Sequence, residues 1–296
     1  MKYNGTIYRP PLEANTLLLP VTEGCSHNKC AFCNMYRGVP FRMTPLEDIE
    51  EYLTDLRRYY GDECDRIDRI YLVGAEPFAL SARRLLERIE IIHRHLPGIR
   101  EITMYARVDN ISTKSDEELA ELHAAGVSDL YIGVECGLER ALAFMNKGHT
   151  AEDTRRECAR LTRADIRHNA LLMVGTAGSG CGIECAEATA RLLNETRPDR
   201  ILVTFLSAFA GTELDKAIKR GEFKMASDRE MLQEERELLA RLDLPQTYFW
   251  AAHSLNSVSV QNFIGSGKDR MLEILDRGIE KMADRPSMRI SLTGSL

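Results

Sequence analysis

The sequence predicts an α/β protein: a partial (β/α)6 barrel of the TIM type, followed by a C-terminal extension of helices and strands. The first observation is that six short apolar segments alternate with amphipathic segments, at a spacing of roughly 30 to 40 residues. The second is that each strand–helix–strand step is long enough for a right-handed crossover between parallel strands. Six units are too few for a closed barrel of eight. We therefore expect a barrel that is incomplete.

The six predicted strands are short, rich in Leu, Ile, Val and Tyr, and largely uninterrupted by charge. This composition is typical of parallel strands that are covered on both faces. They are expected at residues 16–21, 69–74, 101–106, 129–134, 169–174 and 200–205.

The predicted helices lie between these strands and follow the last of them. Two begin with recognisable helix-start chemistry, because Pro45 can occupy a first turn and acidic residues follow Ser115 at the positive end of a helix dipole. The helices are expected at residues 45–60, 81–95, 115–125, 151–164, 184–196 and 213–220.

The last part of the chain has a different composition. Residues 227–242 and 267–283 are predicted to form charged helices, and residues 247–264 between them are richer in aromatic, Ser and Asn residues. We therefore expect a core barrel over residues 1–220 and an extension over 221–296 that covers the open side of the barrel.

Composition and charge exclude some classes of protein. Hydrophobic residues make up 44% of the chain and charged residues 28%, as in an ordinary globular protein. The net charge of −6 gives no electrostatic reason for tight nucleic-acid binding, although a local basic patch is compatible with it. Apolar runs of membrane-spanning or signal-peptide type are absent from the sequence. We expect a cytoplasmic protein, and the sequence does not define an oligomeric state.

Three of the eight cysteines lie close together, directly after the first predicted strand. Cys25, Cys30 and Cys33 have the spacing C-x4-C-x2-C. In parallel α/β folds, ligands bind at the loops that follow the strands. Thiolates this close can share one iron–sulfur cluster, which usually has four cysteine ligands. Three ligands would leave one iron open, as in catalytic metal sites.

Two other interpretations of the triad stay open at this point. A structural zinc site could use His27 as a fourth ligand, but a second pair of cysteines with knuckle spacing does not follow. A thioredoxin-like redox pair needs two cysteines at the start of a helix rather than three.

The segment around the triad resembles the signature of the radical S-adenosylmethionine (SAM) superfamily. That signature is usually C-x3-C-x2-C with an aromatic residue before the last cysteine, and Phe32 stands at this position. The departure is one extra residue between Cys25 and Cys30. The resemblance covers roughly residues 16–220.

The resemblance implies two cofactors, a 4Fe–4S cluster and SAM. It implies that Cys25, Cys30 and Cys33 hold the cluster and that its open iron chelates the amino and carboxylate groups of SAM. A reduced cluster would then release methionine and a 5′-deoxyadenosyl radical, which takes hydrogen from the substrate. In such enzymes the cofactor supplies the reactive chemistry and the protein positions it.

Two further motifs carry the resemblance at the ends of the second and third strands. Gly74, Ala75 and Glu76 are similar to a Gly-Gly-Glu-Pro turn that meets the methionine ammonium group, with Ala75 in place of the second glycine. Tyr105 and Arg107 follow the third strand and could hold a carboxylate or a ribose. The alternatives are a simple turn and a solvated loop.

The fourth and fifth strands end in motifs of the same kind. Residues 133–137 and 145–148 resemble patterns of the branch with oxygen-independent coproporphyrinogen oxidases, methylthiotransferases and the Elongator radical subunit. Glu135 ends a buried strand, which is costly unless the carboxylate is paired or faces a polar pocket, so we expect it at cofactor or substrate. Val174 and Gly175 match a strand end that contacts adenine.

Other candidates lie towards the C-terminus. His253 and Asn256 are the candidate substrate-side catalytic residues, with packing or capping as the alternative. Cys181 and Cys185 are too few for an auxiliary cluster by themselves.

The expected function is that of a radical SAM enzyme with a small-molecule substrate and an electron donor such as flavodoxin or ferredoxin. We expect no membrane partner, and nucleic acid is an unfavoured one. The alternative is a non-catalytic haem or iron–sulfur carrier related to coproporphyrinogen oxidase.

Overall fold

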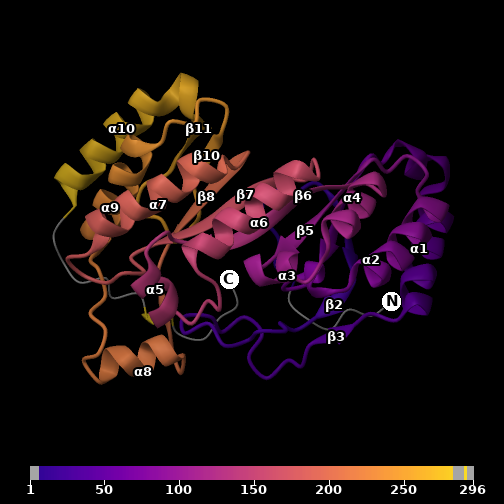
Figure 1. The fold of residues 1–296 in the computed structure, drawn as a ribbon, viewed down its shortest axis with the longest axis horizontal. Helices are drawn as coiled ribbons and strands as arrows, with labels where there is room; N and C mark the ends of the chain where they lie inside the picture. The colour runs from indigo at the N-terminus through magenta and orange to yellow at the C-terminus, as the bar shows by residue number, and fades with distance from the viewer. Residues whose placement is uncertain (1–6, 283–289, 292–296) are drawn as a thin grey trace. The chain divides into compact units, whose positions relative to one another are not determined.

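The computed structural model describes residues 7–282 and 290–291 of the 296-residue chain, and its secondary structure follows the predicted alternation (Figure 1). It divides into two compact units. Unit 1 holds residues 7–28, 36–132 and 159–168. Unit 2 holds residues 29–35, 133–158 and the described residues from 169 onward. The chain passes from one unit to the other inside β6, α6 and β7.

The sheet of unit 1 is parallel, in the order β1-β4-β5-β6. Its register aligns Leu19, Leu72, Met104 and Leu130 across the four strands, and all four side chains are fully buried. The bounds are β1 Leu17–Pro20, β4 Arg69–Val73, β5 Glu101–Ala106 and β6 Val127–Glu135.

The helices of unit 1 begin where the sequence supplies caps. Ser81 accepts a hydrogen bond from the backbone of Arg84, and Ser115 forms a capping box with Glu118. The helices are α1 Leu46–Tyr60, α2 Ala82–His95, α3 Val108–Ser112 and α4 Asp116–Ala124, with 3-10 turns η1 Pro11–Glu13, η2 Gly61–Arg66 and η3 Pro77–Ala79. A small antiparallel ribbon, β2 Thr22–Glu23 with β3 Arg42–Met43, flanks the segment that carries Cys25.

The sheet of unit 2 has the order β7-β8-β10-β11, in which only the last pair is antiparallel. The bounds are β7 Arg167–Val174, β8 Arg200–Phe205, β10 Tyr248–Ala251 and β11 Val260–Phe263. The aromatic segment at 247–264 is therefore a hairpin that extends the sheet. A short strand β9, Ala208–Phe209, pairs with β12, Ile290–Ser291.

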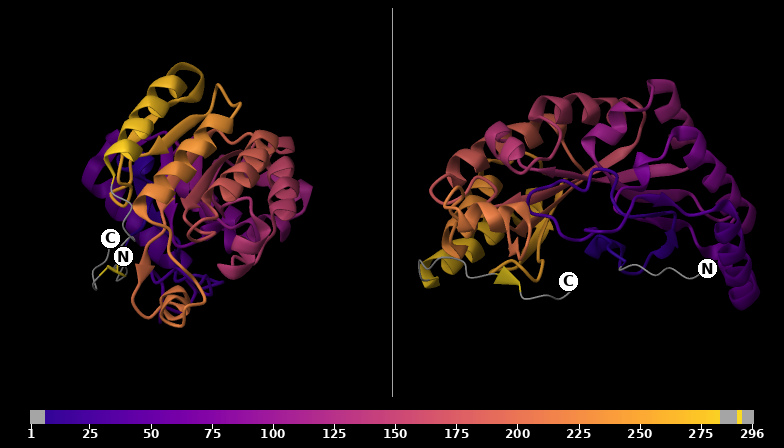
Figure 2. Two further views of the ribbon diagram at one scale, coloured as in Figure 1. Left: turned by 90° about the vertical axis from the view of Figure 1, so that its left-hand side faces the viewer. Right: turned by 90° about the horizontal axis from the view of Figure 1, so that it is seen from below.

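Three helices of unit 2 form a layer in which α9 packs against both α7 and α10. α10, yellow in Figure 2, also lies along β11. The helices are α5 Glu139–Phe144, α7 Gly182–Thr196, α8 Glu213–Lys219, α9 Asp228–Arg241 and α10 Ile264–Lys281, and α6 Ala151–Arg163 continues into unit 1.

The prediction of an α/β fold with six strand–helix units is confirmed, since β1, β4, β5, β6, β7 and β8 lie at the six expected positions. Two short helices, α3 and α5, were not predicted because segments of 5 and 6 residues are too short for a helical period to show. The predicted helix at 267–283 is α10, and residue 283 lies outside the described residues. The described helices are not long and apolar enough for any of them to cross a membrane.

Candidate cofactor site

Cys25 lies in unit 1, directly after the β2 strand. Gly24 before it has a φ of 68°, and a Cβ there would come within 2.5 Å of the Pro40 carbonyl oxygen, so only glycine fits this turn. The Cys25 thiol lies 3.2 Å from Oε1 of Glu76. Its sulfur also accepts a hydrogen bond from the backbone N–H of Asn28 at 3.3 Å. The cysteine is thus held between a buried carboxyl group and a backbone donor.

Glu76 is the centre of the polar contacts at this end of unit 1. Its side chain is 1% exposed and accepts a hydrogen bond from the backbone N–H of Ser26. Its Oε2 lies 3.4 Å from Nε of Arg107, which is 2.9 Å from Asp109. The turn after β4 and the turn after β5 therefore meet the cysteine segment through one carboxylate.

The surroundings of Cys25 oppose ionisation of its thiol. Burial, followed by the nearby Glu76 carboxylate, raises the pKa of Cys25 to about 12. A metal-bound cysteine is deprotonated, so binding of a cation would release the Cys25 proton. The Glu76 carboxylate, which repels a Cys25 thiolate, would attract the bound cation.

Gly74 and Ala75 form the turn between β4 and Glu76. A Cβ on Gly74 would lie 1.9 Å from Oγ1 of Thr22, so the ribbon strand β2 packs where a side chain would otherwise be. Ala75 is half-buried. The structure gives Gly74 a packing reason that the sequence motif alone did not reveal.

Tyr105 and Arg107, both at the end of β5, have different surroundings. The ring of Tyr105 packs edge-to-face on Tyr71 and Tyr131, with centroids 5.7 Å and 6.3 Å away. Arg107 is 6% exposed, and its guanidinium faces Glu76. Of the two, Arg107 is the one whose contacts join the cysteine segment.

Cys30 and Cys33 lie in unit 2, on a segment held by backbone bonds. The N–H of Ala31 donates to the Met145 carbonyl, and the Ala31 carbonyl accepts from the N–H of Leu214, both at 2.9 Å. The Asn146 amide donates to the Lys29 carbonyl at 2.9 Å. The turn after α5 and the start of α8 therefore fix this half of the motif.

The two cysteines of unit 2 are close enough to influence each other. The N–H of Cys33 donates to the Cys30 carbonyl at 3.2 Å. Burial raises the pKa of Cys33, the Cys30 sulfur raises it further, and Lys147 opposes the shift. Cys25, Cys30 and Cys33 are each partly buried and form no disulfide within the described residues.

Glu135 ends β6 in a buried ion pair with Lys147, 2.9 Å away. A Cβ on Gly133 would lie within 3.2 Å of both charged groups, so the pair packs directly on the strand. Glu135 has a φ of 64°, a conformation that costs energy outside glycine and is often found at functional sites. The Lys147 ammonium also lies 5.9 Å from the centre of the Phe32 ring.

Sequence reasoning did not select Lys147 as a site residue. The available signal was its place in the Asn-Lys-Gly turn and the need of a buried Glu135 for a cation. A pairing between positions 12 residues apart could not be read from the spacing alone.

Val174 and Gly175 end β7. The Val174 carbonyl accepts from the N–H of Leu206 at 3.0 Å, so this end is tied to β8. Gly175 has a φ of 89°, and its N–H donates to a carboxylate oxygen of Glu234 at 2.8 Å. The glycine is required by the backbone conformation and by this contact.

His253 and Asn256 follow β10. Both ends of the Asn256 amide bond to β8, because Oδ1 accepts from the N–H of Phe205 at 3.1 Å and Nδ2 donates to the Val203 carbonyl at 3.0 Å. Nδ1 of His253 lies 3.1 Å from the N–H of Leu255, which assigns the proton of the neutral ring to Nε2. Burial lowers the pKa of His253, which favours this neutral form.

The structure thus brings the predicted residues together in two groups. Cys25, Glu76 and Arg107 form the group of unit 1. The group of unit 2 contains Cys30, Cys33, Phe32, Glu135 and Lys147. Within the described part of the chain, no three His, Cys, Asp or Glu side chains are gathered as a metal site.

Of the cysteine pair considered for an auxiliary cluster, Cys181 is partly buried and Cys185 is buried. Cys185 is 1% exposed and packs in one cluster with Cys136, Ala141 and Leu142. Such surroundings fit a buried thiol better than a ligand of an auxiliary cluster.

The residues present fit a 4Fe–4S cluster in their chemistry. Within the described residues, the three cysteines are partly buried and are not used in disulfides. The Asn28 N–H already donates to the sulfur of Cys25, and hydrogen bonds to cysteine sulfur are a feature of iron–sulfur sites. Three thiolates leave one of four irons without a protein ligand.

The family model of the radical SAM superfamily matches residues 19–193. The chain belongs to this superfamily. Its members use a 4Fe–4S cluster and SAM, so the two cofactors expected from the sequence are confirmed at the level of the family.

Two curated relatives show the range of the similarity. The tRNA uridine(34) acetyltransferase of Methanocaldococcus jannaschii is 22% identical over 251 residues, which cover 71% of this chain and 46% of the relative. The tRNA-2-methylthio-N(6)-dimethylallyladenosine synthase of Chlorobium limicola is 25% identical over 308 residues, covering 99% of this chain and 66% of the relative. The chain spans less than two thirds of the length of either relative.

Solved structures show the same fold. Elp3 of the archaeon Methanocaldococcus infernus has a TM-score of 0.56 at 16% identity, covering 92% of this chain and 64% of that one. Coproporphyrinogen III oxidase of Escherichia coli, a radical SAM enzyme, has a TM-score of 0.53 at 18% identity over 76% of this chain and 51% of that one. The partial-barrel fold class predicted from the sequence is that of these neighbours.

Proposed function

We propose that this radical SAM enzyme holds a 4Fe–4S cluster through Cys25, Cys30 and Cys33, cleaves SAM reductively, and abstracts hydrogen from an organic substrate. The observation that carries the proposal is the contact of Glu76 with both Cys25 and Ser26. A buried carboxylate beside the first cysteine is unexpected for a structural zinc site. It fits a site that must also hold the cationic ammonium group of SAM.

When bound, the cluster supplies one electron to SAM, which yields methionine and a 5′-deoxyadenosyl radical. The residues of unit 1 bind and orient the methionine part. Glu76 faces the ammonium group, and Arg107, whose guanidinium is fixed by Glu76 and Asp109, faces the carboxylate. Gly74 and Ala75 allow the chain to turn closely at this point, and the Tyr105 ring packs on Tyr71.

The residues of unit 2 hold the nucleoside part and the second half of the cysteine motif. Glu135 and Lys147 form a neutral pair that presents polar atoms without a net charge. Phe32 packs beside the pair and excludes water from the neighbouring thiols. Val174 and Gly175 present backbone atoms at the end of β7, where a glycine permits close approach of adenine.

His253 and Asn256 take separate roles in this proposal. The Nε2–H of His253 is a hydrogen-bond donor to the substrate, since Nδ1 is already used by Leu255. Asn256 holds the end of β8 in place through its two backbone contacts. The division at residue 220, with 221–296 as an extension over the open side of the core, remains part of the same proposal.

For the substrate we propose a small molecule, with flavodoxin or ferredoxin as electron donor in a cytoplasmic setting. A tRNA nucleoside is the second candidate, because both curated relatives named above are tRNA-modifying enzymes. Those names weaken the expectation, based on a net charge of −6, that nucleic acid is not a partner.

The test is anaerobic reconstitution followed by assay of 5′-deoxyadenosine, with a small-metabolite pool in one arm and bulk tRNA in the other. We expect brown protein with about four irons per chain and SAM cleavage that one arm accelerates. Alanine at Cys25, Cys30 or Cys33 should abolish the cluster absorbance and cleavage, whereas Cys181→Ala should retain both. Zinc in place of iron, or tight haem binding without SAM cleavage, would contradict the proposal.

A further inference from the structure

The glycine-rich loop after β7 is tied to helix α9 by two glutamate side chains. Glu234 accepts the N–H of Gly175 at 2.8 Å. One turn earlier, Oε1 of Glu230 accepts the Ser179 hydroxyl at 3.0 Å and the N–H of Gly180 at 2.7 Å. The two acids therefore hold the first and the last residue of the loop 175–180.

The same helix leaves no room for side chains on this side of the loop. A Cβ on Gly175 would lie 2.8 Å from the Met231 sulfur, and one on Gly182 would lie 3.1 Å from Cβ of Glu234. The Ser179 N–H also donates to the Lys224 carbonyl at 2.8 Å, just before the helix. The loop thus contacts α9 at Gly175, Ser179 and Gly180.

Helix capping does not account for these contacts. Glu230 closes the capping box of α9 with its other oxygen, Oε2, which accepts the N–H of Ser227 at 2.7 Å. Its Oε1 remains for the loop. Glu234 lies in the second turn, where a helix has no free N–H groups to cap, and its side chain is 3% exposed.

The position of Glu234 also has an energetic cost that a purely structural helix would avoid. Burial raises the pKa of Glu234 to about 8, because removal from water disfavours the charged carboxylate. A leucine would fill the same space without that cost, but it would leave the Gly175 N–H without its acceptor.

We propose that Glu230 and Glu234 are positioning residues that fix the conformation of loop 175–180, so that SAM affinity depends on helix α9. This inference rests on the proposed function, in which the end of β7 contacts SAM. Neither acid touches the cofactor in this scheme. They act by keeping the Gly175 backbone in the conformation, with φ of 89°, that the cofactor meets.

The test uses the full-length chain, with the variants Glu234→Ala, Glu234→Gln and Glu230→Ala. Hydrogen exchange of the peptide that covers residues 175–180 is measured first, without SAM. We expect faster exchange in the two alanine variants and nearly wild-type exchange in Glu234→Gln, because a glutamine oxygen can still accept the Gly175 N–H. The dissociation constant of SAM is then measured on cluster-loaded protein and should rise about tenfold in the alanine variants.

Two matched variants control for effects on the helix itself. Ser227→Ala removes the serine half of the capping box and leaves Glu230 Oε1 on the loop. Glu237→Ala removes an acid on the same helix that pairs with Arg241 and not with the loop. Both controls should keep the loop exchange and the SAM affinity of the wild type.

The outcomes separate this inference from the proposed function. Unchanged exchange in Glu234→Ala and Glu230→Ala would overturn the inference, and so would faster exchange with unchanged SAM affinity. If wild-type protein binds SAM without any added protection of residues 175–180, the assignment of the loop to SAM in the proposed function is wrong, and the inference fails with it.

Discussion

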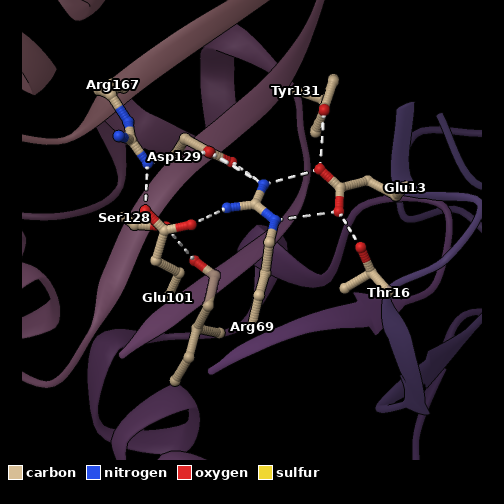
Figure 3. A network of polar contacts seen from close by, with 9 residues as sticks. Glu13, Thr16, Arg69, Glu101, Ser128, Asp129, Tyr131 and Arg167 are labelled. Carbon is tan, nitrogen blue, oxygen red and sulfur yellow. Dashed lines mark hydrogen bonds and ion pairs between the residues drawn. The ribbon is translucent and has the colours of Figure 1, made fainter. Parts of the chain in front are cut away.

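The two ends of the parallel strands in unit 1 both carry buried charges, but in different arrangements. At the amino ends, Arg69 at the start of β4 is surrounded by carboxylates, as Figure 3 shows. Its guanidinium lies 2.7 Å from Glu13, 2.6 Å from Glu101 and 3.0 Å from Asp129. Tyr131 donates to Glu13 as well, at 2.8 Å. The charged groups of this network therefore pair with one another.

At the carboxyl ends, the buried carboxylate of Glu76 has neighbours of several kinds. Glu76 has one cation nearby, Arg107 at 3.4 Å, and otherwise meets the Cys25 thiol and the N–H of Ser26. A carboxylate arranged in this way can accept a further cationic partner. The amino ends thus hold a network of paired charges, and we propose that the carboxyl ends hold a ligand, the division expected of (β/α) barrels.

The largest effect on stability is expected when Arg69, at the centre of the amino-end network, is replaced. Arg69→Met takes the Arg69 cation away from buried Glu13 and Asp129, of which Asp129 keeps Arg167 at 3.4 Å. This should lower the free energy of unfolding by about 3–5 kcal/mol. Urea denaturation monitored by circular dichroism measures this. A loss below about 1 kcal/mol would show that the network does not stabilise the amino ends.

The next effect concerns the carboxyl ends and should appear in binding rather than folding. Glu76→Gln keeps an acceptor for the Ser26 N–H but removes the charge opposite the SAM ammonium group. We expect the dissociation constant of SAM to rise about tenfold to hundredfold, with the unfolding free energy within about 1 kcal/mol of wild type. Equilibrium dialysis and denaturation on the same samples decide this. The reverse pattern, a loss of stability with unchanged SAM affinity, would show that the carboxyl ends of these strands are structural, as the amino ends are.

A pH-dependent effect of intermediate size is expected at Lys114, which supports the turn after Glu76. Its ammonium donates to the Phe78 carbonyl at 2.7 Å, and burial lowers the pKa of Lys114 to about 8. Between pH 8 and about 10.4, the unfolded chain keeps a proton that the folded chain has lost, so stability should rise with pH.

The measurement for Lys114 is the difference in unfolding free energy between wild type and Lys114→Met at several pH values. This difference should shift in favour of wild type by on the order of 2 kcal/mol across that window. A difference independent of pH would show that Lys114 titrates as it does in water.

The smallest effect is expected at the rim of the amino-end network. The Arg167 side chain is 47% exposed and lies 2.8 Å from Glu101. Arg167→Ala should therefore change the unfolding free energy by about 0–1 kcal/mol, less at high salt. A loss of unfolding free energy as large as that of Arg69→Met would mean that the contribution of a network member does not depend on its burial.

The fold, and the strand ends at which the candidate site lies, could be predicted from the sequence for a physical reason. Parallel strands covered on both faces need long apolar runs, and these mark β4 to β8 without reference to tertiary contacts. Ligand loops follow such strands, which leads directly to Cys25, Glu76 and Glu135. The hairpin of β10 and β11 was less clear, since its exposed edge strand lacks a continuous apolar pattern.

Contacts between distant positions could not be predicted in the same way. Arg69 and Glu13 are 56 residues apart, and Gly175 and Glu234 are 59 residues apart. Arg69 lies at a strand start, Glu13 in a 3-10 turn and Glu234 inside a charged helix. Charge at such positions is ordinarily solvated, so composition favours an exposed side chain. The two contacts of the Asn256 amide with β8 join residues 51 and 53 positions apart, and they likewise could not be read from the sequence.

The central claim is that the open iron of a cluster held by Cys25, Cys30 and Cys33 binds SAM directly. The measurement that tests it most directly is electron paramagnetic resonance of the reduced, reconstituted protein with and without SAM. The account predicts a 4Fe–4S signal that shifts on addition of SAM in wild type and is missing when any of the three cysteines is alanine. A cluster signal that SAM leaves unchanged, or one that survives the loss of Cys25, would contradict it.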